Sequence, residues 1–266
     1  MKRFRIISAG SVCLVVVLAG NTFADAEKTK AVKTKKDQTA AVIDAFVTAI
    51  KNDTKVDAGI RRKVLQSVEK LRKNKETRDF ALTEGLRELS AEFRKALELL
   101  GAEDFKSAIA VLKPLAGSKN PFLAAESRYY LARAFMLQEK YELAIPHLEK
   151  IDRELASKTL RAGECLFLKG MAQLHLLKRK AAGADLTKFL KRYPDAPERL
   201  RIAAWRQLEV LRSIELGSLP DIHQHMQFSR RKLALENSGD ETRKVQKKIV
   251  AMLDKMIKEA EKKGGS

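Results

Sequence analysis

Apolar residues recur every three or four positions along most of this chain, which is the spacing of one face of an α-helix. The first such face consists of Val42, Ile43, Phe46, Val47 and Ile50. Two more follow in residues 56–71 and 82–100. Strand-length alternation of apolar and polar residues is absent, and the few Gly and Pro residues lie between the periodic segments. The pattern predicts an all-helical protein.

A longer period lies on top of this helical spacing. A small residue in the middle of one helix is followed twelve positions later by an Ala, and four positions after that by a Leu. The three sets are Ala96 with Ala108 and Leu112, Ala132 with Ala144 and Leu148, and Gly170 with Ala182 and Leu186. Small side chains let two antiparallel helices approach closely, and a large apolar group one turn further on fills the adjoining groove. The period predicts consecutive helical hairpins.

The hairpins resemble tetratricopeptide repeats. In "YYLARAFMLQEKYELAIPHLEK" the matching positions are Leu131, Ala132, Phe135, Ala144 and Leu148, and in the next copy they are Gly170, Ala182, Leu186, Phe189 and Pro194. Arg128, Leu166 and Gln173 replace aromatic residues of the family, Ala156 replaces its terminal Pro, and the copies are longer than the family's 34 residues. The ending "RYPDAP" is similar to repeats of bacterial envelope proteins, and the C-terminal tail is similar to that of secreted planctomycete helical-repeat proteins. The resemblance implies a TPR-like α-solenoid with extra N-terminal and C-terminal helices.

The expected organisation has six parts. They are a signal peptide (1–26), a basic disordered leader (27–37), N-terminal helices (38–88), TPR-like repeats (89–197), capping helices (198–235) with Trp205 packed on the last pair, and a C-terminal amphipathic helix (241–263).

The first 26 residues have the order of a secretory signal peptide. Three cations, Lys2, Arg3 and Arg5, precede an apolar run, and small residues follow it. The run is shorter than the roughly 20 residues that span a bilayer, so cleavage near Ala24 or Ala26 is expected, with an uncleaved anchor as the alternative. We therefore expect a periplasmic or secreted protein without a transmembrane segment after signal removal.

The net charge bears on the choice of partner, and the cysteine content bears on chemical reactivity. The formal net charge is +19, and such an excess attracts polyanions by a long-range, salt-sensitive force. The cations are mixed with acids along nearly every predicted helix, so a generally solvated surface is the preferred explanation of the charge. Nucleic acid is an improbable partner outside the cytoplasm. Cys165, in the apolar run "CLFLKGMAQLHLL", is expected to be buried and inert.

The sequence offers no motif of an enzyme, metal site or cofactor site. A phosphate-cradling Gly-rich loop, a paired-Cys motif and His-Glu-x-x-His are all missing. His223 and His225 are two positions apart, so on a helix they point in different directions, and both are expected at the surface. His147 and His175 are isolated on amphipathic segments. We expect no catalysis and no cofactor.

The predicted function is a protein-interaction scaffold or adaptor of the periplasm or cell envelope. Stacked helix pairs build a concave face on which related architectures hold peptides or helices. The polar candidates along the first helix of each pair are Arg128, Arg133, Gln138, Lys169, Gln173 and Arg201. A basic face would suit an acidic peptide. The alternative is a polyanion-binding envelope protein that uses its basic segments on an anionic polymer or lipid surface.

Overall fold

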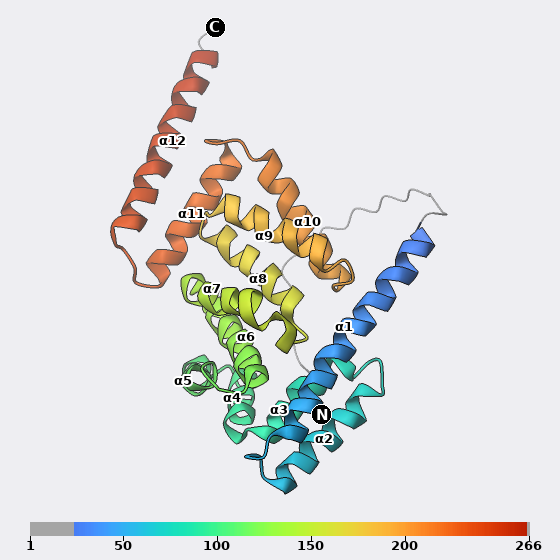
Figure 1. The fold of residues 1–266 in the computed structure, drawn as a ribbon. Coiled ribbons are helices and arrows are strands. Elements are labelled where there is room, and N and C mark those ends of the chain that lie inside the picture. Colours follow the sequence, from blue (N-terminus) through green and yellow to red (C-terminus); the bar gives the residue numbers. More distant parts are fainter. Residues whose placement is uncertain (1–23, 265–266) are drawn as a thin grey trace.

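The structure, a computed structural model, describes residues 24–264 and, within them, the side chains of residues 38–263. Every regular element in this range is helical (Figure 1). The α-helices are α1 (Ala24–Asn52), α2 (Ala58–Arg72), α3 (Ala81–Leu89), α4 (Ala91–Gly101), α5 (Phe105–Leu115), α6 (Pro121–Leu137), α7 (Tyr141–Lys150), α8 (Ala162–His175), α9 (Arg179–Arg192), α10 (Glu198–Ser213), α11 (Leu219–Ala234) and α12 (Asp240–Gly264). The predicted all-α class is confirmed for the described residues.

Helices α1 to α3 form an N-terminal group that packs tightly around Gly85. A Cβ atom at Gly85 would lie 2.7 Å from Val68 on α2 and 2.8 Å from Phe46 on α1, so glycine is what lets α3 approach both helices. The third predicted apolar segment is not one helix. It breaks at Ser90, whose extended backbone ends α3 and whose hydroxyl accepts a hydrogen bond from Phe93 N at the start of α4.

The sequence predicts a signal peptide and a disordered leader at the N-terminus, and only the leader lies wholly within the described residues. Residues 27–37, expected to be a disordered leader, form the first part of α1. Lys, Ala, Glu and Gln have high helix propensity, so this segment continues the amphipathic helix that follows it. The predicted signal peptide, residues 1–26, lies almost entirely outside the described residues.

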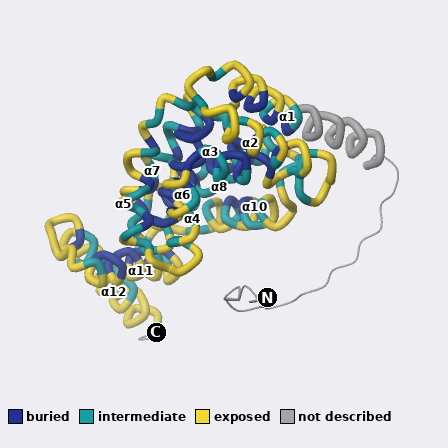
Figure 2. The backbone as a smooth tube through the Cα atoms, turned by 90° about the horizontal axis from the view of Figure 1, so that it is seen from below, coloured by how far each residue is buried: buried dark blue, intermediate teal, exposed yellow. Residues whose placement is uncertain are grey.

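Between residues 91 and 192, consecutive helices form three hairpins, α4–α5, α6–α7 and α8–α9. The small residues predicted at their contacts are buried completely at Ala96, Ala108, Ala132, Ala144 and Ala182. The closest approach is at Gly170 on α8, where a Cβ atom would lie 2.8 Å from the side chain of Leu186 on α9. Figure 2 shows that the buried segments run along the inside of these helices.

The three hairpins turn in the same way. The second residue after the first helix has a left-handed backbone, with φ values of 61° at Glu103, 56° at Glu139 and 58° at Leu177. In each turn the next backbone N–H then donates to a carbonyl five residues earlier, from Asp104, Lys140 and Lys178 to Leu99, Phe135 and Gln173. This is the bond pattern that closes many helix C-termini, although glycine is the usual residue at the left-handed position.

Helix α7 does not stop at Lys150. The chain continues as one turn of π-helix, Ile151–Leu155, and a short 3₁₀ turn, Ala156–Lys158. Ala156 stands in this stretch, and an alanine, unlike a proline, permits the helix to continue. The extra turn places Asp152 between neighbouring hairpins, where its buried carboxylate pairs with Lys188 at 2.7 Å and with Arg192 at 3.2 Å.

Three helices, α10 to α12, follow the hairpins. Helix α10 packs on α9 through Ala204 and Leu208, but Trp205 is 57% exposed and does not pack on the last pair. Helix α11 forms a further hairpin with α12, again through a left-handed residue, Glu236. Its Phe228 joins Tyr141, at the start of α7, in an apolar cluster.

The burial or exposure of two side chains, Cys165 and His225, was also predicted from the sequence. Cys165 is buried, as expected, and burial raises the pKa of its thiol. His225 was expected at the surface, and this was wrong. It is 4% exposed because α12 covers it, and its Nδ1 lies 2.8 Å from the Asp221 carbonyl oxygen. Among the described helices, none has the length and apolar character needed to cross a membrane.

Candidate functional site

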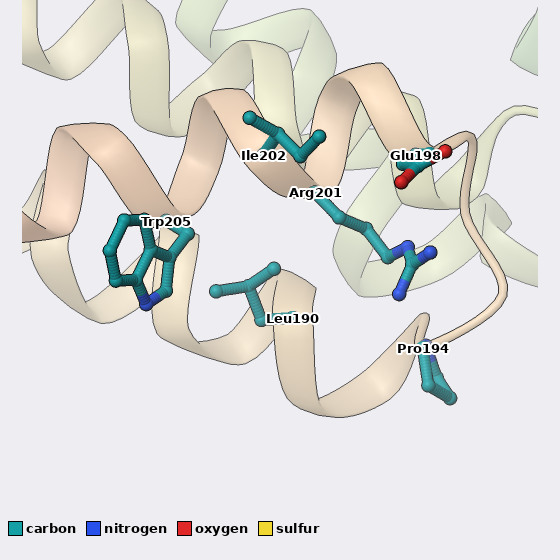
Figure 3. A pocket seen from close by; sticks show the side chains of 6 residues that line it. All are labelled: Leu190, Pro194, Glu198, Arg201, Ile202 and Trp205. Carbon is teal, nitrogen blue, oxygen red and sulfur yellow. The ribbon is translucent and has the colours of Figure 1, made fainter. Parts of the chain in front are cut away.

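An open groove with a volume of about 370 Å³ lies between α9 and α10. Figure 3 shows Trp205 and Leu190 at one end and the Arg201 side chain reaching toward Pro194 at the other. Its lining residues are Leu190, Pro194, Glu198, Arg201, Ile202 and Trp205.

The groove follows from the way α9 ends and α10 begins. Helix α9 stops before Pro194, and α10 starts directly after Pro197, so a short turn brings the two helices side by side. The inner face of α10 packs on α9 through Ala204 and Leu208. The outer face of α10 then overhangs Leu190 and forms one wall of the groove.

This outer face is unusually apolar for a surface. Trp205 is 57% exposed and Ile202 is 43% exposed, and both lie one turn or less from Arg201. Arg201 is exposed, and its Nε donates a hydrogen bond of 3.1 Å to the Ala196 carbonyl, which holds the side chain along the groove. Exposed Trp beside Arg is the combination most enriched among residues that dominate protein–protein binding energy.

The six residues predicted as binding positions are not gathered at one place. Arg201 alone of the six lines the α9–α10 groove. Arg133 is exposed on α6 and donates to the Tyr129 hydroxyl at 3.3 Å, whereas Gln138 caps the end of α6 and accepts a hydrogen bond from Lys140. Arg133 and Gln138 therefore lie on α6, outside the groove that Arg201 lines.

Arg128 faces the second helix of its own hairpin. Its Nη1 lies 3.5 Å from His147 Nδ1 on α7. Burial lowers the pKa of His147 to about 4, and the positive charge of Arg128 adds to this effect. Arg128 and Arg133 are five residues apart, which turns them about 140° from each other on the helix. They do not form one basic face.

Lys169 and Gln173 share a face of α8, but both are more than nine-tenths buried. The Lys169 ammonium pairs with Asp152 at 3.5 Å and with Asp185 at 3.2 Å, between adjacent hairpins. The Gln173 Oε1 atom accepts no hydrogen bond from the described residues. In this arrangement the Lys169 side chain connects helices of the chain itself.

A second polar cluster lies where the N-terminal helices meet the hairpins. The carboxylate of Glu126, 1% exposed, accepts hydrogen bonds from Thr159 at 2.6 Å, from Thr83 at 3.2 Å and from Arg161 Nε at 3.3 Å. The Arg161 guanidinium also stacks 4.7 Å from the centre of the Tyr129 ring.

This cluster joins parts of the chain that are far apart in sequence. Thr83 belongs to α3, Glu126 to α6, and Thr159 and Arg161 to the link before α8. Every oxygen of Glu126 is engaged, so the cluster is a complete internal network rather than an open binding site. The signal that sequence reasoning missed is an acid within the apolar run "FLAAES", which only a buried partner explains.

Among the described residues, the side chains that could hold a metal ion are dispersed. No group of three or more His, Cys, Asp or Glu side chains among them is arranged to hold a metal ion. His223 is exposed, while His225 is held between the Asp221 carbonyl and Lys248, whose Nζ lies 2.9 Å from His225 Nε2. His225 therefore takes part in the packing of α11 on α12, whereas His223 does not.

No protein-family model, curated protein or solved structure matches this chain. The resemblance to tetratricopeptide repeats accordingly rests on the chain's own residues and turns.

Proposed function

We propose that this protein is a non-catalytic adaptor, built as a TPR-like α-solenoid, that binds a segment of another protein in the α9–α10 groove. The observation that carries the proposal is Trp205, which is 57% exposed in the α9–α10 groove, beside Arg201 and Ile202. Leaving so large an apolar side chain in water is unfavourable unless a ligand covers it.

The solenoid part of the proposal is supported by the recurrence of one local structure. The turns at Glu103, Glu139 and Leu177 have the same backbone geometry, and each follows a buried small residue by seven positions. A repeat that cannot bury its apolar face alone does so by stacking on its neighbours. Such stacks expose long surfaces on which protein segments bind.

The lining of the groove defines the chemistry of its ligand. Trp205, Ile202 and Leu190 offer contact to bulky apolar side chains, and the guanidinium of Arg201 offers two parallel hydrogen bonds to a carboxylate. A volume of about 370 Å³ suits a few side chains rather than a whole domain. We therefore propose a short segment with an aromatic or aliphatic anchor near an acidic residue.

The cellular place belongs to the proposal as well. Residues 1–26 have the order of a secretory signal peptide, and the groove lies on a chain of net charge +19. We propose that the adaptor works in the periplasm or on the cell envelope, where acidic protein segments are its partners. The signal itself can be tested by N-terminal sequencing of the exported protein, which should begin near Asp25 or Glu27.

A second function is favoured by composition. The chain has 53 Lys and Arg residues against 34 Asp and Glu residues. A protein that uses this excess on an anionic envelope polymer would bind polyphosphate of many lengths, and raising the salt from low to moderate concentration would abolish the binding. Binding in the groove depends mainly on apolar contact, so it should survive the same increase.

The test uses a displayed library of random peptides, selected on the intact protein alone, and the affinities of the selected peptides are then measured on the variants. The selected peptides should carry an aromatic or aliphatic residue next to an acid. Trp205→Ala should weaken their affinity by about 30-fold or more, as truncation of a dominant interface residue does. Arg201→Gln should weaken it less, and Trp205→Phe should retain most of it.

Three results would contradict the proposal. One is a library from which no peptide binds. Another is a set of peptides that bind wild type and Trp205→Ala equally, which would place the ligand elsewhere. The third is binding of polyphosphate alone, lost at moderate salt and indifferent to Trp205, which would establish the polyanion function instead.

A further inference from the structure

The C-terminal helix is much longer than the helix it pairs with. Helix α12 has 25 residues and α11 has 16, and the two run antiparallel from the turn at Glu236. Lys248 lies opposite His225, with 2.9 Å between Nζ and Nε2. The nine additional residues extend α12 by about 13 Å beyond the start of α11, and Figure 1 shows this end projecting from the molecule.

Only one face of α12 is covered. Thr242 and Ile249 are 1% and 9% exposed and pack toward α11. A neighbouring stripe lies open, with Val250 57% exposed, Leu253 37% exposed and Ile257 55% exposed. With Ala260, the stripe has spacings of three, four and three residues, which is the repeat along which helices pair in coiled coils.

Charged residues flank this stripe in an ordered way. Lys247, Asp254 and Glu261 are seven residues apart, so they lie along one edge of the stripe. None of the three forms an ion pair with another residue whose side chain the structure describes. The edge is thus positive toward the start of α12 and negative toward its end.

We propose that α12 pairs antiparallel with α12 of a second copy of this chain, making a homodimer. In the two-fold arrangement that packs Leu253 of each copy against Ile257 of the other, Lys247 lies opposite Glu261. Symmetry repeats this pair, so two attractive contacts form along the edge. The apolar stripes of the two copies then cover each other.

The same arrangement contains one unfavourable contact. Asp254 lies close to the two-fold axis and therefore faces Asp254 of the other copy. Two like charges in that position weaken the pairing. Replacing Asp254 by Asn removes this repulsion, so the proposed register predicts a tighter dimer. The prediction is specific, because removing an acid from a basic protein raises its net charge and would otherwise oppose association.

A second copy fits this stripe better than a lipid surface does. Anionic headgroups would approach the edges of an embedded stripe, and here one edge carries the carboxylates of Asp254 and Glu261. In the antiparallel pair Glu261 meets a lysine. The complementarity belongs to the helix with itself, which is why the partner is a second copy.

The test is sedimentation equilibrium of the intact protein with a set of charge variants. Glu261→Lys should weaken self-association by about tenfold, because two attractive contacts become repulsive. Lys247→Glu should do the same, and the double variant Lys247→Glu, Glu261→Lys should restore the wild-type dissociation constant. Asp254→Asn should tighten the dimer. Lys262→Glu is the control, since Lys262 lies about 180° from Leu253 on the helix.

Several outcomes would overturn the dimer. A wild-type protein that stays monomeric up to its solubility limit excludes it. A dimer that the double variant fails to restore has another interface or register. Ile257→Lys should abolish the dimer while circular dichroism reports unchanged helix content. If instead the wild type is monomeric and binds vesicles containing phosphatidylglycerol, and Ile257→Lys abolishes that binding, the stripe is a membrane contact.

Discussion

The middle hairpins and the C-terminal hairpin turn alike but are buried differently. Glu139 between α6 and α7 and Glu236 between α11 and α12 have nearly the same left-handed backbone, with φ of 56° and 55°. In the middle, the large residue after the second small one is fully buried, as at Leu148 and Leu186. In α12, Val250 and Ile257 remain more than half exposed.

The difference shows what each level of structure contributes. The turn is decided within a few residues of backbone, so it recurs wherever the helices are antiparallel. Burial is decided by neighbours. Each middle hairpin packs against helices before and after it in the chain, whereas α12 packs mainly on α11 and contributes only Val245, near its start, to the cluster around Tyr141. An apolar stripe without such a neighbour is the place where a partner from outside the chain is expected.

The largest difference between the two regions is expected when one leucine in each is replaced by alanine. Leu186→Ala leaves a cavity against Gly170 and should lower the free energy of unfolding by about 2–5 kcal/mol. Leu253→Ala, on the open stripe of α12, should lower it by less than about 1 kcal/mol when measured on dilute protein. Urea unfolding curves of both variants give the two values. Equal losses would mean that α12 is packed like the middle helices.

Adding volume at a small residue should give the next largest effect. Gly170→Leu forces a side chain into the 2.8 Å contact with Leu186 and should cost about 1–3 kcal/mol. Ala251→Leu is the matched change on the exposed side of α12 and should be within about 0.5 kcal/mol of wild type. Thermal unfolding followed by circular dichroism distinguishes the two. A tolerant Gly170 would argue against close packing of α8 on α9.

Acidity should weaken the middle hairpins through His147. Its pKa is about 4 in the folded chain, against about 6.5 when unfolded, so below pH 6.5 the unfolded chain binds a proton that the folded chain does not. Neutral, buried His147 therefore stabilises the folded chain. This contribution to the free energy of unfolding is complete above pH 6.5 and is lost as the pH falls toward 4. Between pH 7 and 5 it should amount to at most about 2 kcal/mol. Urea titrations of wild type and His147→Gln measure it, and equal slopes would contradict the assignment.

The smallest expected effect is a gain in the free energy of unfolding, and it should be similar in the middle hairpins and in the C-terminal hairpin. Leu177 and Glu236 hold backbone conformations that glycine adopts without strain. Leu177→Gly and Glu236→Gly should each raise the free energy of unfolding by up to about 1 kcal/mol, after the greater entropy of glycine in the unfolded chain is subtracted. Loss of stability at either position would show that its side chain makes a contact more important than backbone strain.

The sequence was sufficient for what depends on local periodicity. The apolar stripes and the small residues at Ala96, Ala132 and Gly170 identified the helical class and the middle hairpins. It was insufficient for contacts made across the chain. Nothing near Glu126 in sequence indicates its partners Thr83 and Arg161, and nothing near His225 shows that Lys248 will cover it.

The candidate site was predictable only in part. Arg201 was singled out as a polar position on a first helix, and it does line the groove. Trp205 was expected to pack on the last helix pair, but it is 57% exposed. Its exposure depends on the angle between α9 and α10, which the short Pro-rich turn sets and which periodicity alone does not reveal.

The emission of Trp205 tests the proposed binding most directly, because it is the single tryptophan of the chain and lies in the groove. A library-selected peptide without tryptophan is titrated into wild-type protein at moderate salt. The account predicts that the emission maximum moves to shorter wavelength as the peptide removes water from the indole, with the same midpoint as binding measured by calorimetry. Saturated binding with unchanged emission would place the ligand elsewhere and contradict the account.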